Sequence, residues 1–200
     1  MKKLVLVLIS FILTINILGC SNFQSEEIPK IKFVYESLSK REEYLMSLTG
    51  NKVLTYKLKD IPKEIKYEIS LTYEVYENDK KIKEDTIISS IRDEIGEKDE
   101  NRSMGLNIEN SKIRYILDFD NGFSSGDYDL KEDLKNYSTS YLTDDVDLEL
   151  GKDIYIYYAT SSNKMSDNIP LGVPIDEEVT KNILNNSNST LLLRLSFKEI

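Results

Sequence analysis

Apolar side chains recur at every second position from Tyr67 to Val75, with polar side chains between them. Successive side chains of a β-strand point to opposite faces, so this alternation predicts a strand with one buried and one wet face. Asn78-Asp79 suits a tight turn, and residues 82–91 then predict the returning strand of a hairpin. Residues 113–119 and 191–197 alternate in the same way and predict two more strands.

The segment DIYIYYAT, residues 153–160, is apolar on both faces, which is typical of a central strand. Pro170 and Pro174 interrupt the chain after it, and Asp176 predicts the cap of a short helix that runs to Ile183. Strands in hairpins with few helices favour a mainly β fold. We expect an antiparallel β-sandwich-like single domain with one or two short helices.

Residues 31–49 allow two interpretations. Ser39 and Glu42 have the spacing of a helix-capping box. Gly50-Asn51 instead indicates a tight turn, which would join residues 44–58 into a hairpin. The hairpin is slightly favoured, with any helix confined to the residues before it.

Two connecting segments complete the expected fold. Residues 96–104 are strongly charged and predict a loop. Leu130, Leu134 and Tyr137 have a spacing that allows one short helix at most.

Composition excludes several kinds of catalytic site. The chain has no histidine and a single cysteine, Cys20. Serine and cysteine triads that need histidine are therefore excluded, and so are zinc sites built on histidine or cysteine. The formal net charge of −9 argues against nucleic acid as a partner, because phosphates attract basic surfaces.

The first twenty residues have the organisation of a secretory signal, with Lys2 and Lys3 before an apolar run from Leu4 to Ile15. The run is too short to span a bilayer, which takes about 20 apolar residues. Ile17-Leu18-Gly19-Cys20 resembles the lipobox of bacterial lipoproteins. This resemblance is confined to residues 1–20. It implies that a peptidase cleaves before Cys20 and that the Cys20 thiol carries a diacylglyceryl group.

These features predict the organisation of the whole chain: a signal peptide over residues 1–19, a lipidated tether over 20–30 and a β-rich globular domain over 31–200. Two acyl chains convert marginal membrane binding into stable attachment. The expected location is therefore outside the cytoplasm, with the protein held to the cell membrane by the lipid on Cys20.

The segment from residue 118 to residue 129 is acidic and contains two glycines. It predicts a loop whose carboxylates could bind calcium, which takes several oxygen ligands: Asp118, Asp120, Asp127 and Asp129. The spacing does not match an EF-hand loop, because Phe123 stands where that motif needs glycine. A solvated hairpin loop is the alternative interpretation. Calcium, or an envelope glycan bound with nearby tyrosines, is the ligand of our second functional hypothesis.

Other candidate catalytic groups carry little information. Two pairs have the S-x-x-K spacing of serine acyltransferases, which chance explains in this composition: Ser37 with Lys40, and Ser161 with Lys164. Three grouped carboxylates are typical of a solvated strand end in an acidic chain: Asp144, Asp145 and Asp147. We therefore assign no catalytic residue. The leading hypothesis is a non-enzymatic interaction or structural module that binds another envelope or surface protein, and a carboxylate-dependent hydrolase is the enzymatic alternative.

Overall fold

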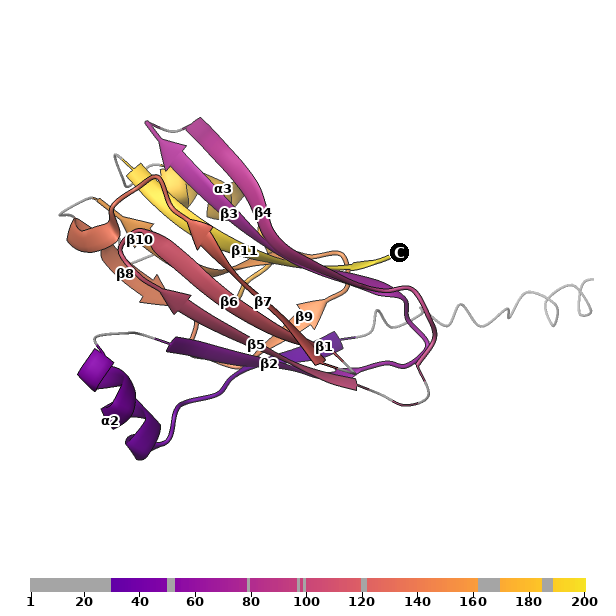
Figure 1. Ribbon diagram of the computed structural model, residues 1–200. Coiled ribbons are helices and arrows are strands. Elements are labelled where there is room, and N and C mark those ends of the chain that lie inside the picture. The colour runs from indigo at the N-terminus through magenta and orange to yellow at the C-terminus, as the bar shows by residue number, and fades with distance from the viewer. Residues whose placement is uncertain are drawn as a thin grey trace, which may run out of the picture.

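The computed structural model describes residues 30–49, 53–78, 80–96, 98, 100–119, 122–161, 170–184 and 189–200. Within these residues the chain forms two antiparallel sheets that face each other as a sandwich (Figure 1). This confirms the mainly β fold expected from the alternating pattern. Across the described ranges, the structure contains no helix long and apolar enough to cross a membrane.

The first sheet has six strands in the order β7-β6-β5-β2-β1-β9. Its strands are β1 (Lys30–Tyr35), β2 (Val53–Ile61), β5 (Glu100–Ile108), β6 (Lys112–Phe119), β7 (Gly122–Asp129) and β9 (Val146–Glu149). The second sheet has five strands in the order β4-β3-β11-β10-β8. Its strands are β3 (Tyr67–Glu77), β4 (Lys80–Arg92), β8 (Ser138–Tyr141), β10 (Asp153–Thr160) and β11 (Ser189–Glu199).

The core lies between the two sheets and takes one side chain in two from each inner strand. On β3 the alternating apolar residues point inward, as their spacing predicts. Aromatic rings join neighbouring strands: Phe33 stacks on Tyr56 with ring centroids 4.8 Å apart, and Tyr67 stacks on Phe197 at 4.9 Å. Such pairs contribute about 0.5–1.5 kcal/mol beyond the burial of their area.

The hairpin expected over residues 44–58 is wrong, because residues 40–49 form a helix, α2 (Lys40–Thr49). Its capping box is formed: the Ser39 N–H donates to Glu42 Oε2 at 2.8 Å, and the Glu42 N–H donates to Ser39 Oγ at 3.4 Å. Both edges of β2 are already paired, with β1 on one side and β5 on the other. No edge of β2 is therefore left for a hairpin partner.

Two expected loops are strands in the structure. Residues 100–104 begin β5, so the charged loop expected over residues 96–104 is shorter than predicted. The acidic segment 118–129 is a hairpin in which β6 pairs with β7 over eight residue pairs. The turn residues 120 and 121 lie outside the described part of the chain.

The expected helices are short. The helix α3 (Glu177–Leu184) begins where predicted, and Asp176 Oδ1 accepts a hydrogen bond from the Val179 N–H at 2.8 Å. The segment near Leu134 is one 3₁₀ turn, η1 (Leu134–Asn136). Val179 on α3 packs with Tyr76, Tyr155 and Leu192 on the outer face of the five-stranded sheet, so this helix adds a small second core there.

The sandwich has two ends, which we call the near end, where β1 begins, and the far end, where α2 lies (Figure 1). The near end contains the start of β1, the connection from β2 to β3 and the C-terminal Ile200, whose N–H donates to the Lys66 carbonyl. The far end contains α2, the turn from β3 to β4, and η1. A six-residue strand, β1, leads from the near end toward α2.

Candidate functional site

A groove opens at the far half of the sandwich between the edge strands β4 and β7. We call it the edge groove. Its volume is about 560 Å³, and its lining comes from β4, β7 and the residues after β7: Ile82, Lys83, Asp85, Tyr128, Asp129, Lys131 and Glu132. The groove therefore brings together side chains from both sheets along one side of the sandwich, where the edge strand of one sheet faces the edge strand of the other.

The Tyr128 ring and the Lys83 ammonium group form the floor of the edge groove, and the buried ring of Tyr73 packs against Tyr128. The ring centroids of Tyr73 and Tyr128 lie 5.4 Å apart. The Lys83 Nζ lies 4.8 Å from the Tyr73 centroid and 5.2 Å from that of Tyr128. An ammonium group this close to aromatic faces is attracted by their quadrupoles. Burial alone would lower the pKa of Lys83, but hydrogen bonds to Tyr128 and Asp85 raise it, so Lys83 is positively charged at neutral pH.

Both tyrosine hydroxyls donate to carboxylates at the groove. Tyr73 donates to Glu132 Oε2, and Tyr128 donates to Asp85 Oδ2. Burial and the neighbouring carboxylate raise the pKa of Tyr73 well above its usual range, so its phenol stays protonated and keeps donating. The hydrogen bond from Tyr128 is the main reason why the pKa of Asp85 is lowered. The floor is therefore a fixed polar surface.

The rim of the edge groove has groups that remain accessible. The side chain of Ile82 is 53% exposed, and the Asp129 side chain is 86% exposed. Lys131 makes no hydrogen bond or ion pair with any residue that the structure describes. The groove thus has an apolar contact, an exposed ammonium group and exposed carboxylates at its mouth, which suits a ligand with polar and apolar parts.

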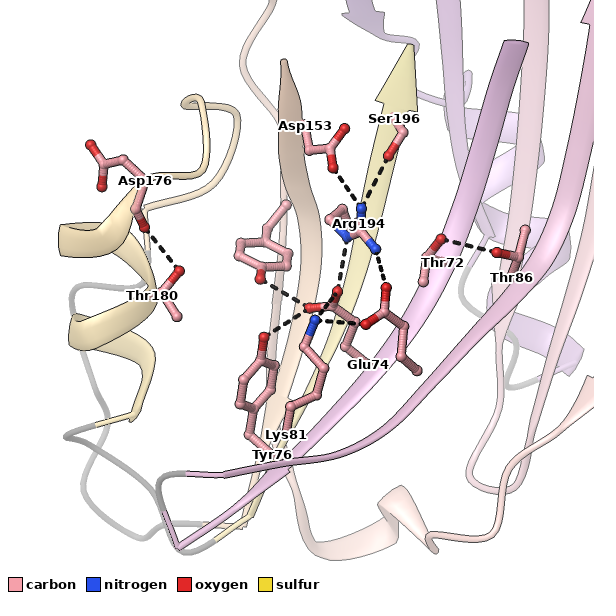
Figure 2. A network of polar contacts seen from close by, with 12 residues as sticks. Thr72, Glu74, Tyr76, Lys81, Thr86, Asp153, Asp176, Thr180, Arg194 and Ser196 are labelled. Atoms are coloured by element: carbon pink, nitrogen blue, oxygen red, sulfur yellow. Dashed lines mark hydrogen bonds and ion pairs between the residues drawn. The ribbon is translucent and has the colours of Figure 1, made fainter. Parts of the chain in front are cut away.

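A second polar cluster lies on the outer face of the five-stranded sheet, beside α3 (Figure 2). Its centre is Glu74, whose side chain is 1% exposed. Glu74 Oε2 accepts from the Tyr76 hydroxyl at 3.1 Å and from the Tyr155 hydroxyl at 3.0 Å. Glu74 Oε1 accepts from Lys81 Nζ at 2.9 Å and from Arg194 Nε at 2.8 Å. Four donors occupy the roughly four lone-pair sites of this carboxylate, so Glu74 has no free site for a substrate.

Arg194 connects this Glu74 cluster to the strands β4 and β10. It donates to Glu84 on β4 at 2.6 Å and forms an ion pair with Asp153 on β10. Lys81 also pairs with Glu84 at 2.8 Å. These contacts join four neighbouring strands on one face, so they hold this part of the sheet together.

A third cluster joins the two sheets at the near end. Arg92 on β4 donates to Glu100 on β5 and to the carbonyls of Pro62 and Ile65. Arg102 pairs with Glu100 at 2.8 Å, and the Tyr67 hydroxyl donates to the same carboxylate at 2.9 Å. Both arginines and Glu100 are buried. The cluster therefore closes this end of the sandwich with paired charges.

The structure separates the carboxylates of the predicted calcium site. Asp118 lies opposite Phe123 and accepts the Ser103 N–H at 2.6 Å. Asp127 pairs with Lys112 at 3.2 Å and with Arg114 at 3.7 Å. Asp129 pairs with Lys112 at 3.7 Å. Residues 123 and 129 are six positions apart along the strand, which is about 20 Å.

These three carboxylates therefore do not converge, and Asp120 lies outside the described residues. Within the described part of the chain, no group of three acidic or cysteine side chains is arranged to hold a metal ion.

The remaining sequence candidates are scattered. Cys20 and Lys164 lie outside the described residues. Ser37 is exposed before α2, and Lys40 is the first residue of that helix. Three grouped carboxylates lie in and just before β9: Asp144, Asp145 and Asp147. All three are exposed, as expected for a solvated strand end.

The sequence interpretation missed Glu74 and Lys83. The wet face predicted for β3 is wrong at Thr72 and Glu74, which are 4% and 1% exposed. Alternation places both on the outer face correctly, but it does not show that this outer face is itself covered. No local signal marks Lys83 either, because its aromatic neighbours Tyr73 and Tyr128 come from distant parts of the chain.

Comparison with protein-family models, with curated proteins and with solved structures finds no match to this chain.

Proposed function

We propose that this chain is a lipid-anchored interaction module that acts outside the cytoplasm and presents the far end of its sandwich to a protein partner. The lipobox-like residues 17–20 support the anchor on Cys20. The module is non-enzymatic in this proposal. The fully occupied carboxylate of Glu74 supports that choice, since the most deeply buried acidic group has no free site for a substrate.

One observation carries the proposal: α2 exposes three large apolar side chains, and this helix lies at the end of the sandwich opposite the start of β1 (Figure 1). The side chains are Tyr44, Leu45 and Leu48, which are 64%, 48% and 68% exposed. Residues four apart lie on the same side of a helix, so Tyr44 and Leu48 are neighbours. Grouped exposed apolar side chains are typical of protein interaction sites.

The position of α2 relative to the anchor favours a protein over the bilayer as the partner. Cys20 and Lys30 are ten positions apart, and such a segment reaches at most about 35 Å. The tether thus brings the near end of the sandwich to the bilayer. The far end, with α2, reaches away from the lipid toward other envelope or surface proteins.

The first prediction tests the anchor. In a bacterial host, Cys20→Ser should release the protein from the membrane fraction and abolish its labelling by radioactive fatty acid, because no thiol remains to be acylated. Ser21→Ala is the matched control and should stay labelled and membrane-bound. A Cys20→Ser variant that remains in the membrane fraction would contradict the anchor.

The second prediction tests the surface. A photo-crosslinking amino acid in place of Leu48 should capture a protein on the intact cell, because this side chain is exposed at the far end. The control is the same amino acid in place of Ile95, which is 66% exposed in the connection after β4 at the near end. Capture of the same proteins at both positions, or of lipid alone at position 48, would contradict the proposal.

A further inference from the structure

The strand β7 is an open sheet edge. It pairs with β6 on one side only, and its register runs through eight residue pairs without a shift. Natural edge strands are protected by bulges, by proline or by charged side chains, lysine above all. β7, with the sequence GFSSGDYD, has no bulge, proline or lysine, and its charged residues are the carboxylates Asp127 and Asp129. Among the residues that the structure describes, no backbone hydrogen bond is made to the outward edge of β7.

The neighbouring edge strand β4 is less able than β7 to pair with an added strand. The register between β3 and β4 shifts twice, and the shifts leave Ile82 and Ile87 of β4 without a counterpart on β3. Bulges of this kind disrupt the regular ladder that an added strand needs. Lys83 and Asp85, moreover, contact Tyr128 of β7, so β4 presents fixed charges toward the gap beside β7.

Glycine and serine make up half of the residues of β7. A Cβ at Gly126 would lie 2.5 Å from the Tyr115 hydroxyl, so the inner side of β7 is packed closely by that ring. On the outer side Phe123 is 67% exposed. At the end of β7, Tyr128 and Asp129 enter the lining of the edge groove. A strand added along β7 would therefore lead directly into that groove.

Charge decides which kind of strand fits. In the edge groove Lys83 and Asp85 pair with each other at 3.4 Å. The other charged residues of the lining are Asp129, Glu132 and Lys131, so carboxylates are in excess. The whole chain also carries a formal charge of −9. A second copy would bring like charges together, whereas a basic segment would be attracted.

We infer that the β7 edge binds an extended, basic polypeptide segment of another protein as an added strand, one end of which occupies the edge groove. Main-chain hydrogen bonds to β7 supply the affinity in this mode of recognition, and the side-chain pockets supply the specificity. This inference stands on the geometry of β7 and β4 and does not depend on the anchor or on α2.

The test uses the full-length chain in detergent micelles and a fluorescent heptapeptide of alternating lysine and valine. We expect this peptide to bind about tenfold more tightly than one of alternating glutamate and valine, as opposite charge favours. Methylation of alternate main-chain nitrogens on the basic peptide should abolish binding, because a methylated edge cannot donate to β7. Equal binding of the methylated peptide would overturn the inference.

Matched variants separate the groove from general charge attraction. Asp129→Lys should weaken binding of the basic peptide about tenfold, whereas Asp144→Lys, at an exposed aspartate of the connection between β8 and β9, should change it less than about twofold. Ile82→Ser, which removes an apolar contact without adding charge, should weaken binding, and Ile91→Ser, elsewhere on β4 and 61% exposed, should not. Equal losses within each pair would overturn the inference. It would also be overturned if the chain formed a dimer in the absence of peptide and Asp129→Lys changed the amount of that dimer, because a second copy would then occupy the β7 edge.

Discussion

Glu74→Ala should lower the free energy of unfolding by about 3–5 kcal/mol, the range for removal of one partner from a buried ion pair. The substitution removes the acceptor of Arg194 Nε and of the Tyr76 and Tyr155 hydroxyls. Arg194 keeps Glu84 and Asp153 as partners, whereas both buried hydroxyls lose the carboxylate that accepts from them. A domain of this size is stable by only about 5–15 kcal/mol, so the loss is a large part of the total. Urea unfolding of the full chain in detergent, followed by tyrosine fluorescence, measures it.

The control for this prediction is Glu77→Ala, since Glu77 is an exposed glutamate of the same strand. We expect that control to change the free energy of unfolding by less than about 0.5 kcal/mol. Tyr155→Phe removes a single donor and should cost about 1 kcal/mol. A loss for Glu74→Ala no larger than that of the control would show that the cluster beside α3 contributes nothing to stability.

Glu100→Gln should destabilise the near end of the sandwich by a similar amount, about 3–5 kcal/mol, because it leaves two buried arginines without their counter-charge. It should also change how stability depends on pH. Burial alone would raise the pKa of Glu100, but hydrogen bonds from Arg92 and Tyr67 and the charges of both arginines lower it overall.

The direction of the pH effect follows from that lowered pKa. A carboxylate whose pKa is lower in the folded state contributes stability that is fully present above its unfolded pKa of about 4.3. This contribution disappears as the pH falls through the folded pKa. The wild-type chain should therefore lose stability more steeply than Glu100→Gln below about pH 4.3. Parallel curves for the two chains would contradict the prediction, and Glu64→Gln, at an exposed glutamate, is the control.

The arrangement of the strands could be anticipated only in part from the sequence. Alternation at residues 67–75 and 191–197 locates β3 and β11, because a half-buried strand repeats its apolar side chains with period two. The same rule gives no information about partners. Residues 67–77 and 189–199 pair along their whole length although more than a hundred residues separate them.

Short segments with competing signals were harder to interpret. Gly50-Asn51 has the composition of a hairpin turn, but the capping box of α2 and the paired edges of β2 decide for a helix. The glycines and aspartates of residues 122–129 suggested a loop, although β6 offers them a free edge and they form a strand. In both cases the availability of a strand edge, a tertiary property, outweighs local propensity.

The sequence by itself determined the mainly β class, the N-cap of α3 at Asp176, and the absence of histidine-dependent chemistry. Each follows from side-chain periodicity, from a local hydrogen bond or from composition. Only the tertiary structure decided that Glu74 is buried among Tyr155, Arg194 and their neighbours, and that Lys83 lies against two tyrosine rings. The physical reason is that burial and charge pairing depend on which distant strands and helices come to lie against a residue.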